Sequence, residues 1–363
     1  MERRKFLSAG AGAAGAVGTA FAAPNIVRAQ ESFNWRMTNA YPPGAPFVTV
    51  GPGSPTDFVE KVRTMSQGRL NIQHYGAGEL IPALEGFDAV TSGTIEMNAA
   101  NSYFWSGRSF ALNYFTTVPF GLSFQGHMSW LYHGGGLDLW NEVYEPFNAV
   151  ALPFNNTGVQ FVGWFREPVE SIEDMQGLRI RIPGIAAAIY EEIGAESTLL
   201  PAGEIFPALE RGVIDAAEFV GPAQDLPLGF YQAASYYYTG GWHEPATTGE
   251  LLINKAAWDS LPEDLQEIVQ VAAKMCVFES QSWSEAANGP ALRELVDDHG
   301  VQLRELPDDV LDALYDATGT VLEREVERDD MVRKVHESFF AFKEDHDEWS
   351  NHSEGVWHRR IVR

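Results

Sequence analysis

Strand patterns and helix patterns alternate along the chain, and this order is the feature that most constrains the fold. Residues Phe33–Thr38 alternate in polarity as a strand does, and Thr56–Ser66 has the spacing of a helix with one apolar face. Residues 70–75 return to a strand pattern, 83–91 to a helix and 95–99 to a short strand. This alternation predicts an α/β fold with a largely parallel sheet.

The same alternation resumes in the second half of the chain. The expected strands are Val150–Phe154, Phe161–Phe165 and Arg179–Ile182, and the expected helices are Ala186–Ile193, Gly203–Arg211 and Ala256–Ser280. From about Pro307 onward the pattern is helical and acidic, and aromatic residues near helical spacing in 332–349 indicate docking onto this chain or a partner subunit. Because about 330 residues exceed one comfortable core, two lobes are expected.

The N-terminal residues 1–29 have the composition of an export signal. Arg3 and Arg4 precede Phe6, and a long stretch rich in alanine and glycine ends in small residues near Ala29. The arginine pair favours the twin-arginine route, with an ordinary export signal as the alternative. No later run approaches the ~18 apolar residues of a membrane span. We therefore expect a soluble periplasmic protein.

The charge balance and the cysteine content exclude several classes of function. Fifty acidic residues stand against 25 basic ones, which argues against binding to nucleic acid or to anionic membranes. The same acidity fits a saline habitat or ordinary solubility. Cys276 is the one cysteine in the sequence, so an intramolecular disulfide and a multi-cysteine metal site are both excluded. A negatively charged ligand would need local compensation in so acidic a chain.

Arg181 is the first candidate for that compensation. It lies in GLRIRIP, where Arg179 and Arg181 share one face of a predicted strand and Ile180 lies on the other. Ligands bind at the carboxyl ends of strands in open α/β sheets, and a guanidinium grips a carboxylate with two parallel hydrogen bonds. A solvated strand with a surface salt bridge remains the alternative.

Two glutamates and an amide supply oxygen atoms of the kind that hold a hard cation. Glu218 lies between Ala217 and Phe219, where an unpaired charge is costly, and Glu244 follows a Gly-Gly-Trp run. With Gln160 these oxygens favour calcium, magnesium or sodium over transition metals. The two glutamates also fit a glycosidase pair, and their spacing does not separate the two interpretations.

Charge counting favours calcium over sodium at such a site. Two glutamates and one ligand carboxylate carry three negative charges, and Arg181 carries one positive charge. A divalent cation neutralises this group, whereas sodium leaves a negative charge in a cleft of low dielectric constant. A small apolar pocket around the ligand is expected from several aromatic residues, namely Tyr103, Phe104, Trp105, Trp164, Phe219 and Trp242.

Common catalytic motifs are absent from the sequence. The run His133-Gly134-Gly135-Gly136 resembles the oxyanion-hole segment of some esterases, but no G-x-S-x-G elbow accompanies it. There is also no H-E-x-x-H motif, Walker loop or EF-hand pattern. The glycine run is therefore interpreted as a turn or a helix breaker.

A series of short motifs resembles the extracytoplasmic solute-binding subunits of TRAP transporters (tripartite ATP-independent periplasmic transporters). The similarity runs over almost the whole chain after the export signal, and it is greatest to the branch that binds 2-oxo acids or 2-hydroxy acids. The motifs are AGEL at Ala77–Leu80, YHGGGLDLWNE at Tyr132–Glu142, NTGVQ at Asn156–Gln160, GWFRE at Gly163–Glu167, DMQGLRIR at Asp174–Arg181, the run Glu218–Pro222, and GWHE at Gly241–Glu244.

The resemblance implies the two-lobed fold of periplasmic solute-binding proteins, with crossing strands, a long connecting helix and a C-terminal helical tail. The expected boundaries are residues 30–153 plus 218–254 for lobe I, 154–217 plus 255–325 for lobe II, and 326–363 for a C-terminal dimerisation helix exchanged between two protomers.

The resemblance also implies roles for individual residues. Arg181 matches the arginine that binds the ligand carboxylate. The residues expected to contact the ligand are Arg181, Gln160, Asn156, Tyr103, Phe104 and Phe219, and those implied to hold a calcium or sodium ion are Gln160, Glu218, the carbonyl of Phe219, and Glu244. Phe219 and His243 stand where tryptophan is frequent in the family, which leaves the identity of the acid open.

The expected function is that of a periplasmic receptor, not an enzyme. It would capture a small 2-oxo or 2-hydroxy monocarboxylate, close around it and deliver it to the permease subunits of a TRAP transporter. The alternative is a secreted metal-dependent hydrolase or lyase that uses the same carboxylates and an activated water.

Overall fold

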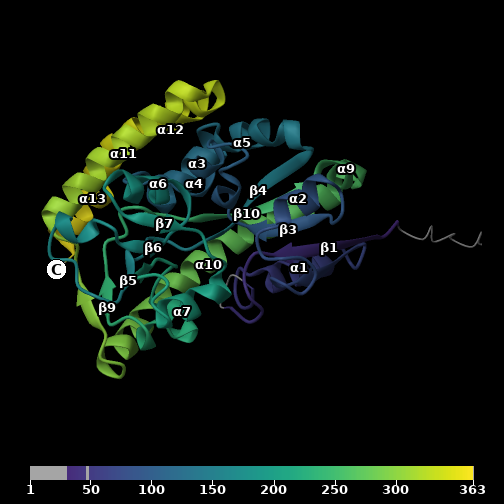
Figure 1. The fold of residues 1–363 in the computed structure, drawn as a ribbon. Coiled ribbons are helices and arrows are strands. Elements are labelled where there is room, and N and C mark those ends of the chain that lie inside the picture. The colour runs from purple at the N-terminus through teal and green to yellow at the C-terminus, as the bar shows by residue number, and fades with distance from the viewer. Residues whose placement is uncertain (1–30, 46–48, 363) are drawn as a thin grey trace, which may run out of the picture. The chain divides into compact units, whose positions relative to one another are not determined.

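Two β-sheets with helices packed on them form the framework of this computed structural model, which describes residues 31–45 and 49–362 (Figure 1). The first sheet has the order β2-β1-β3-β10-β4, with β1 Phe33–Asn39, β2 Leu70–Tyr75, β3 Met97–Ala100, β4 Ala149–Asn156 and β10 Thr248–Asn254. The second has the order β11-β9-β5-β8-β6-β7, with β5 Gly163–Phe165, β6 Arg179–Arg181, β7 Glu196–Thr198, β8 Ala216–Ala217, β9 Tyr236–Tyr238 and β11 Gln302–Arg304. The expected export signal at residues 1–29 lies outside the described residues.

In each sheet one strand runs against its neighbours. Strand β10 is antiparallel to both β3 and β4, while β1 pairs in parallel with β2 and β3. In the second sheet β5 is antiparallel to β8 and β9, while β6 pairs in parallel with β7 and β8. The chain crosses from the first sheet to the second after β4 and returns after β9. The reversed strands β5 and β10 are therefore the ones that the chain enters through these two crossings.

The helices cover the sheets and link them. Their bounds are α1 Pro55–Met65, α2 Gly86–Thr91, α3 Leu112–Thr116, α4 Phe124–His133, α5 Gly136–Tyr144, α6 Gly184–Glu192, α7 Ala202–Glu210, α8 Pro222–Asp225, α9 Lys255–Ser260, α10 Glu263–Asp297, α11 Asp308–Arg328, α12 Asp330–His352 and α13 Glu354–Val356. Short helical turns occupy Ser102–Trp105 (η1), Glu145–Phe147, Ile172–Met175, Leu226–Leu228, Phe230–Gln232 and Trp357–Ile361. None of the helices in the part of the chain that the structure describes is long and apolar enough to cross a membrane.

The core of the first sheet follows from the alternation in β1. Trp35 and Met37 point to the face on which α1 buries Phe58 and Val62, and α10 adds Leu265 to the same cluster. Burying each such side chain stabilises the folded protein by roughly 1.5–3 kcal/mol relative to leaving that side chain exposed. The strand and helix periodicity of the sequence therefore correctly predicts which residues of β1 and α1 face this core.

One predicted helix, Ala256–Ser280, has the wrong bounds. The structure divides this region into α9, which ends at Ser260, and α10, which begins at Glu263 and runs for 35 residues. Leu261 is extended because the ring of Pro262 disfavours the helical conformation for the residue before it. Helix α10 then packs along β4 and reaches α8, which confirms the expected long connecting helix (Figure 1).

The glycine run after α4 is a turn, as its composition predicted. Gly134 caps α4, and Gly135 has a φ of 86°, a conformation that side-chain-bearing residues rarely adopt. A Cβ on Gly136 would lie 2.8 Å from the ring of Trp130. This segment therefore reverses the chain between α4 and α5 and has no catalytic geometry of its own.

The expected boundary that gives residues 218–254 to lobe I differs from the sheet membership. Strand β9 pairs with β5 of the second sheet, whereas β10 pairs with β3 and β4 of the first. By its strand pairing the chain returns to the first sheet after β9, not at residue 218. Local sequence patterns do not reveal this, because strand pairing depends on contacts between distant segments.

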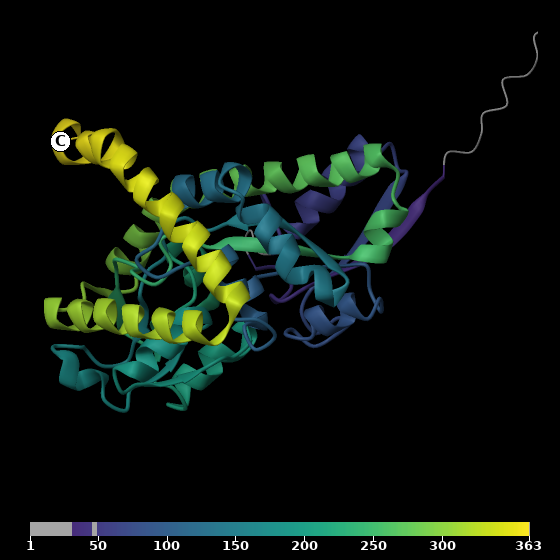
Figure 2. The ribbon, with the colours of Figure 1, turned by 90° about the horizontal axis from the view of Figure 1, so that it is seen from above.

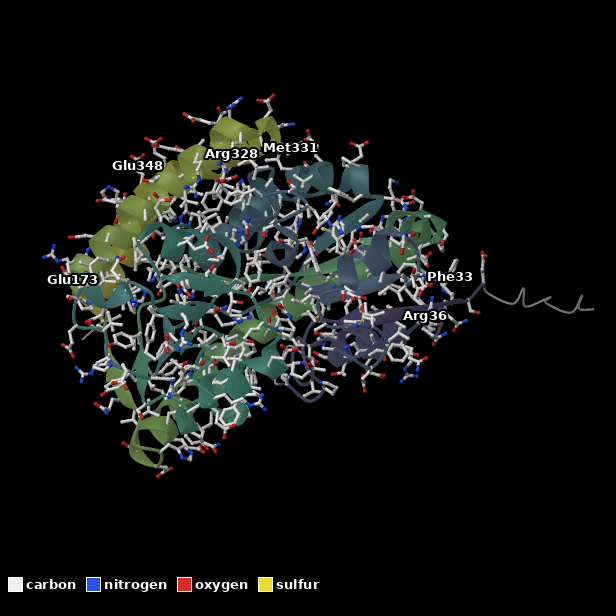
Figure 3. The ribbon with its side chains drawn as sticks, in the orientation of Figure 1. Phe33, Arg36, Glu173, Arg328, Met331 and Glu348 are labelled. Atoms are coloured by element: carbon white, nitrogen blue, oxygen red, sulfur yellow. The ribbon has the colours of Figure 1, made fainter. Side chains whose placement is uncertain are left out.

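Of the C-terminal helices, α11 packs on α6 and α12 packs on α3, α4 and α5. Asp329 caps α12 by accepting hydrogen bonds from the backbone of Met331 (2.7 Å) and Val332 (3.2 Å) at the turn after Arg328 (Figure 3). Helix α12 buries Phe339 beside Trp130, with ring centroids 5.0 Å apart. Its far end extends away from the rest of the ribbon (Figure 2).

A buried carboxyl on β10 makes the stability of the fold depend on pH. Glu250 accepts hydrogen bonds from Trp105 Nε1 (3.1 Å) and the Tyr144 hydroxyl, and burial raises its pKa from 4.5 to about 7. Because the pKa of Glu250 is higher in the folded than in the unfolded chain, its protonated carboxyl stabilises the fold. This contribution is fully present below pH 4.5 and is lost as the pH rises through 7.

We therefore expect urea unfolding to show a steeper loss of stability from pH 4.5 to 8 for the natural chain than for Glu250→Gln. From pH 4.5 to pH 8 the free energy of unfolding of the natural chain should fall by about 3 kcal/mol more than that of Glu250→Gln. The matched control is Glu167→Gln, an exposed position whose pH profile should follow that of the natural chain. Parallel profiles for all three proteins would contradict this assignment.

Candidate functional site

The two segments that cross between the sheets lie side by side and form the floor of the candidate site. The backbone N–H of Gln160 donates to the carbonyl of Glu244 (3.1 Å), and that of Thr157 donates to the carbonyl of Thr247 (3.1 Å). Gly241 donates to the carbonyl of Gln160 (3.1 Å), and a Cβ at Gly241 would lie 2.1 Å from that oxygen. The crossing therefore requires glycine at this position and brings Gln160 next to Glu244.

Arg181 and Glu218 come to the same place from neighbouring strands. Strands β6 and β8 pair in parallel, and the Glu218 N–H donates to the Arg181 carbonyl (3.0 Å). Arg181 Nη1 donates to the Glu218 carbonyl (2.6 Å) and to Glu218 Oε2 (3.1 Å), while its Nε donates to the carbonyl of Leu200 (3.3 Å). Arg181 is 3% exposed and Glu218 is 1% exposed, so this is a buried ion pair.

The two arginines of β6 have opposite surroundings although they share a face. Arg179 is half-exposed and forms a surface pair with Asp215 (2.5 Å). Two residues further along the strand, Arg181 points into the buried cluster at the carboxyl end. The surface-strand alternative therefore describes Arg179, and the ligand-facing alternative is compatible with Arg181.

Three titratable side chains meet in this cluster. Glu218, His243 and Glu244 are buried, and each offers one ligand atom within 4.8 Å of those of the other two. Burial raises the pKa of Glu218 to about 8 against the opposing effect of Arg181. Burial, with the neighbouring Glu218, raises the pKa of Glu244 to about 8. Burial lowers the pKa of His243 to about 4, so its imidazole is neutral at pH 7.

Several oxygen atoms in the cluster have lone pairs that the protein does not use. Gln160 Nε2 donates to Thr247 Oγ1 (2.9 Å) and Thr157 Oγ1 (3.3 Å), which fixes the orientation of the amide. Among the residues that the structure describes, Gln160 Oε1 and Glu218 Oε1 have no hydrogen-bond partner. Buried oxygens left in this state are costly, and a bound cation would satisfy them. The donor set therefore fits a metal ion.

A small cavity adjoins the cluster. Its lining residues are Tyr41, Asn101, Tyr103, Asn155, Thr157, Gln160, Arg181, Phe219, Val220 and Thr247. One wall is aromatic and another carries the guanidinium of Arg181. Such a cavity suits a small ligand with one anionic end.

The chain is similar to known proteins over most of its length. Residues 49–329 match the family described as bacterial extracellular solute-binding protein, family 7. The chain belongs to this family. A monocarboxylate 2-oxoacid-binding periplasmic protein of Nostoc sp. is 37% identical over 321 residues, which are 88% of this chain and 86% of that protein.

Two solved structures are similar to this solute-binding protein over nearly their whole length. A TRAP periplasmic solute-binding protein from Pseudoalteromonas atlantica, with bound sodium and pyruvate, is 37% identical with a TM-score of 0.88. One from Colwellia psychrerythraea, with bound calcium and pyruvate, is 38% identical with a TM-score of 0.87. Each match covers 91% of this chain and 99% of the other. The predicted two-lobed TRAP receptor fold is confirmed.

The structure brings together most of the residues expected at the site of this solute-binding protein. Gln160, Arg181, Glu218 and Glu244 lie in or beside the cluster, and Tyr103 and Phe219 are among the residues that line the cavity. These residues come from β6, from η1, from the segment after β8 and from both crossing segments. Their roles toward a ligand remain predictions.

Asn156 and Phe104 lie outside the lining of the cavity. Asn156 Nδ2 donates to Thr248 Oγ1 (3.0 Å) and its Oδ1 accepts from the Gly158 N–H (2.8 Å). These bonds hold the turn that carries Gln160. Phe104 packs edge-on against Tyr103, with centroids 4.9 Å apart. Their positions favour supporting roles over direct contact.

Three of the aromatic residues expected around the pocket belong to the core or to its polar contacts. Trp164 Nε1 donates to Asp225 Oδ2 (2.8 Å), and Trp105 donates to Glu250. Trp242 stacks on Phe120 at 5.4 Å. Buried tryptophans commonly find such partners for their N–H groups or rings.

Sequence reasoning missed polar residues that line the cavity. Tyr41 and Asn101 follow the carboxyl ends of β1 and β3, and their side chains are hydrogen-bonded to each other. Asn155, Thr157 and Thr247 lie at the ends of β4 and of the returning segment. A rule that polar residues at the carboxyl ends of strands face the ligand would have found Tyr41 and Asn101.

The buried ion pair makes a testable prediction about stability. At pH 9, above the Glu218 pKa of about 8, Arg181→Met leaves the buried Glu218 carboxylate without its cation, and we expect a loss of about 3 kcal/mol or more in the free energy of unfolding. The double variant Arg181→Met with Glu218→Gln should recover part of that loss, because the buried charge is removed as well. Urea unfolding in the presence of chelator measures both.

The matched control is Arg179→Met on the same strand. Its pair with Asp215 is partly exposed and screened by solvent, so the expected loss is clearly smaller than that of Arg181→Met. Equal losses for the two arginine variants, or strictly additive losses in the double variant, would contradict a buried pair at Arg181.

Proposed function

We propose that this protein is a periplasmic TRAP receptor that binds a small 2-oxo or 2-hydroxy monocarboxylate, such as pyruvate or lactate, through Arg181 and a bound cation. The observation that carries the proposal is that one buried guanidinium and a set of buried oxygen donors lie together beside a small cavity. The receptor then delivers the acid to the membrane permease subunits of the transporter.

The chemistry of the site matches both ends of such an acid. The ligand carboxylate would accept hydrogen bonds from Arg181. Gln160, Glu218, the carbonyl of Phe219, and Glu244 would hold the cation, which supplies a positive charge for the carboxylate and the neighbouring 2-oxygen. The aromatic rings of Tyr41, Tyr103 and Phe219 leave little room for more than a short carbon chain.

Charge balance supports a divalent ion. Glu218 and Glu244 with one ligand carboxylate carry three negative charges, and Arg181 with a divalent cation carries three positive charges. Uncompensated charge is costly in a buried site, so calcium neutralises the group better than sodium. The two similar structures contain calcium in one case and sodium in the other, each with pyruvate.

Binding would be coupled to closure of the two sheet-bearing halves around the acid. Exclusion of water strengthens the contacts of the guanidinium and the cation, since electrostatic interactions grow as the dielectric constant falls. A ligand that binds the closed form more tightly shifts the population toward it. The permease would distinguish the loaded receptor by this conformation.

Membership of a family of solute-binding proteins favours a receptor over a metal-dependent hydrolase or lyase. The same family indicates a periplasmic or extracellular location, and the arginine pair near the N-terminus agrees with export. Assays of purified protein with pyruvate-like and ester substrates separate the two classes, because a receptor releases its ligand unchanged.

Thermal unfolding with a panel of small acids tests the ligand assignment. Pyruvate or lactate at 100 times its Kd should stabilise the folded protein by about 2.7 kcal/mol. We expect this shift to disappear with chelator and in Arg181→Ala, because each removes one of the two positive charges that hold the carboxylate.

Arg179→Ala is the matched control, because it removes an arginine from the same face of β6 without touching the cavity. It should keep the ligand-dependent shift. Stabilisation by dicarboxylates or amines alone would overturn the monocarboxylate assignment, and a shift unaffected by chelator would remove the cation from the proposal.

We also propose that the C-terminal segment 326–363 joins two copies of the chain. Helix α12 packs on α3, α4 and α5 of its own chain, yet Trp349 is 69% exposed and Trp357 is 55% exposed beyond the packed part. Aromatic side chains are enriched at protein interfaces, and these two are exposed in the last segment of the chain.

Truncation after Glu348 tests this interface while keeping the buried residues of α12. The full chain should sediment as a dimer and the truncated chain as a monomer with an unchanged circular dichroism spectrum. Tyr315→Ser, which removes an exposed aromatic ring from α11, should leave the dimer intact. An unchanged mass after truncation would refute the dimerisation role.

A further inference from the structure

Asp225 is a buried carboxyl group that the proposed function does not use. It ends the short helix α8 and is 1% exposed. Its Oδ1 accepts hydrogen bonds from the backbone N–H groups of Val220 and Gly221, at 3.2 Å each. Its Oδ2 accepts from Trp164 Nε1 and from the Tyr237 hydroxyl, at 2.8 Å each. Both oxygens of this buried group are therefore satisfied by the protein itself.

The partners of Asp225 fit its ionised form. An ionised carboxyl only accepts hydrogen bonds, whereas a protonated carboxyl must also donate one. The indole N–H of Trp164 and the two backbone N–H groups can only donate. Burial raises the pKa of Asp225 from 3.8 to about 6 against the opposing effect of these hydrogen bonds. The carboxyl is therefore charged at pH 8, inside the protein and away from solvent.

The second sheet holds one oxygen of Asp225 in place. Trp164 of β5 and Tyr237 of β9 lie opposite each other in the antiparallel pair, and their rings stack with centroids 3.9 Å apart. Both side chains donate to Oδ2, so the carboxylate has a fixed position relative to the sheet. The other oxygen binds the loop after β8. Asp225 therefore fastens this loop to the sheet.

The bond to Val220 also orients the carbonyl of Phe219. This carbonyl and the Val220 N–H belong to one trans peptide unit, in which the two groups point in opposite directions. With the N–H turned toward Asp225, the Phe219 carbonyl is turned away from it. Phe219 directly follows Glu218, whose carbonyl and carboxylate both contact Arg181. A negative charge at the N–H end polarises the peptide and makes its carbonyl oxygen a stronger ligand.

We propose that Asp225 is a positioning residue of the cation site, which directs and polarises the Phe219 carbonyl and thereby favours Ca²⁺ over Na⁺. The inference rests on the proposed function for the existence of the cation and for the Phe219 carbonyl as one of its ligands. It adds a residue that acts on the ion through a peptide group and through its charge.

The preference for calcium follows from the charge of Asp225. With this residue, four negative charges (Asp225, Glu218, Glu244 and the ligand carboxylate) stand against Arg181 and the cation. The charge of Asp225 already acts on Glu218, because it adds to burial in raising the pKa of that carboxyl against the effect of Arg181. Coulomb attraction is proportional to the charge of the ion, so Asp225 stabilises Ca²⁺ about twice as much as Na⁺.

Calorimetric titration of chelator-treated protein in saturating pyruvate at pH 8 provides the test. Asp225→Asn keeps the shape of the side chain but removes its charge and places an NH₂ group among donors. We expect Ca²⁺ to bind about tenfold more weakly or worse. Na⁺ should lose only about threefold, the square root of that factor. A variant that merely lowered the fraction of competent protein would weaken both ions by one factor. Equal factors would therefore overturn the proposal.

Two control variants separate charge from packing. Tyr237→Phe removes one donor to Asp225 but keeps its charge and its bond to Val220, so the ratio of Ca²⁺ to Na⁺ affinity should stay the same. Asp215→Asn removes a partly exposed carboxylate that pairs with Arg179 on the surface, and it should leave both affinities unchanged. A change of the ratio in Tyr237→Phe as large as that in Asp225→Asn would contradict the role of the charge.

Nuclear magnetic resonance of the Phe219–Val220 peptide gives a measurement without a bound ion. We label the phenylalanine carbonyl with ¹³C and valine with ¹⁵N. In metal-free protein, Asp225→Asn should move the Val220 amide proton upfield, because a hydrogen bond to a charged acceptor is lost. The pair Phe58–Val59 in α1 is the internal control and should not move. An unmoved Val220 amide would refute the orienting role.

The natural chain alone supplies a test that does not depend on any variant folding. Addition of Ca²⁺ and pyruvate should shift the ¹³C resonance of the Phe219 carbonyl, whereas that of Phe58 should stay in place. An unshifted Phe219 carbonyl in protein that binds Ca²⁺ would overturn the proposal for Asp225 and leave the receptor standing. Failure of the natural chain to bind any cation with pyruvate or lactate would refute the proposed function, and the role of Asp225 with it.

Discussion

The burial of two carboxyl groups beside one guanidinium is the constraint on which the site depends. Glu218 and Glu244 are almost fully enclosed, and Arg181 contacts Glu218 through both its carboxylate and its carbonyl. Burial raises the pKa of each carboxyl to about 8, so the pair is costly to ionise by itself. A cation with an anionic ligand would resolve this imbalance, as the proposed function requires.

The crossing topology places these charges together. Residues far apart in the chain become neighbours because the segment after β4 and the segment before β10 run side by side, with Gln160 hydrogen-bonded to Glu244. The same segments connect the two sheets. A ligand that bridges Arg181 and the cation would therefore contact both halves of the molecule, which is how binding energy can drive closure.

Much of the fold could be predicted from periodicity alone. The strands at β1 and β2 and the helix at α1 were identified almost residue by residue, since one face of each is apolar and the other polar. The sheet membership of β9 and the break at Pro262 were not identified. Pairing partners depend on contacts between distant segments, and local patterns do not encode them. Motif resemblance, rather than spacing, pointed to Gln160 and Glu244 as partners.

The sequence by itself determined the alternating α/β elements, the acidic surface and the identity of Arg181, Glu218 and Glu244 as unusual polar residues in apolar surroundings. Only the tertiary structure decided which arginine of β6 is buried, that Asn156 supports the turn instead of facing the cavity, and that His243 points into the carboxylate cluster. The physical reason is that burial and side-chain direction are set by whichever element packs opposite, and that element lies elsewhere in the chain.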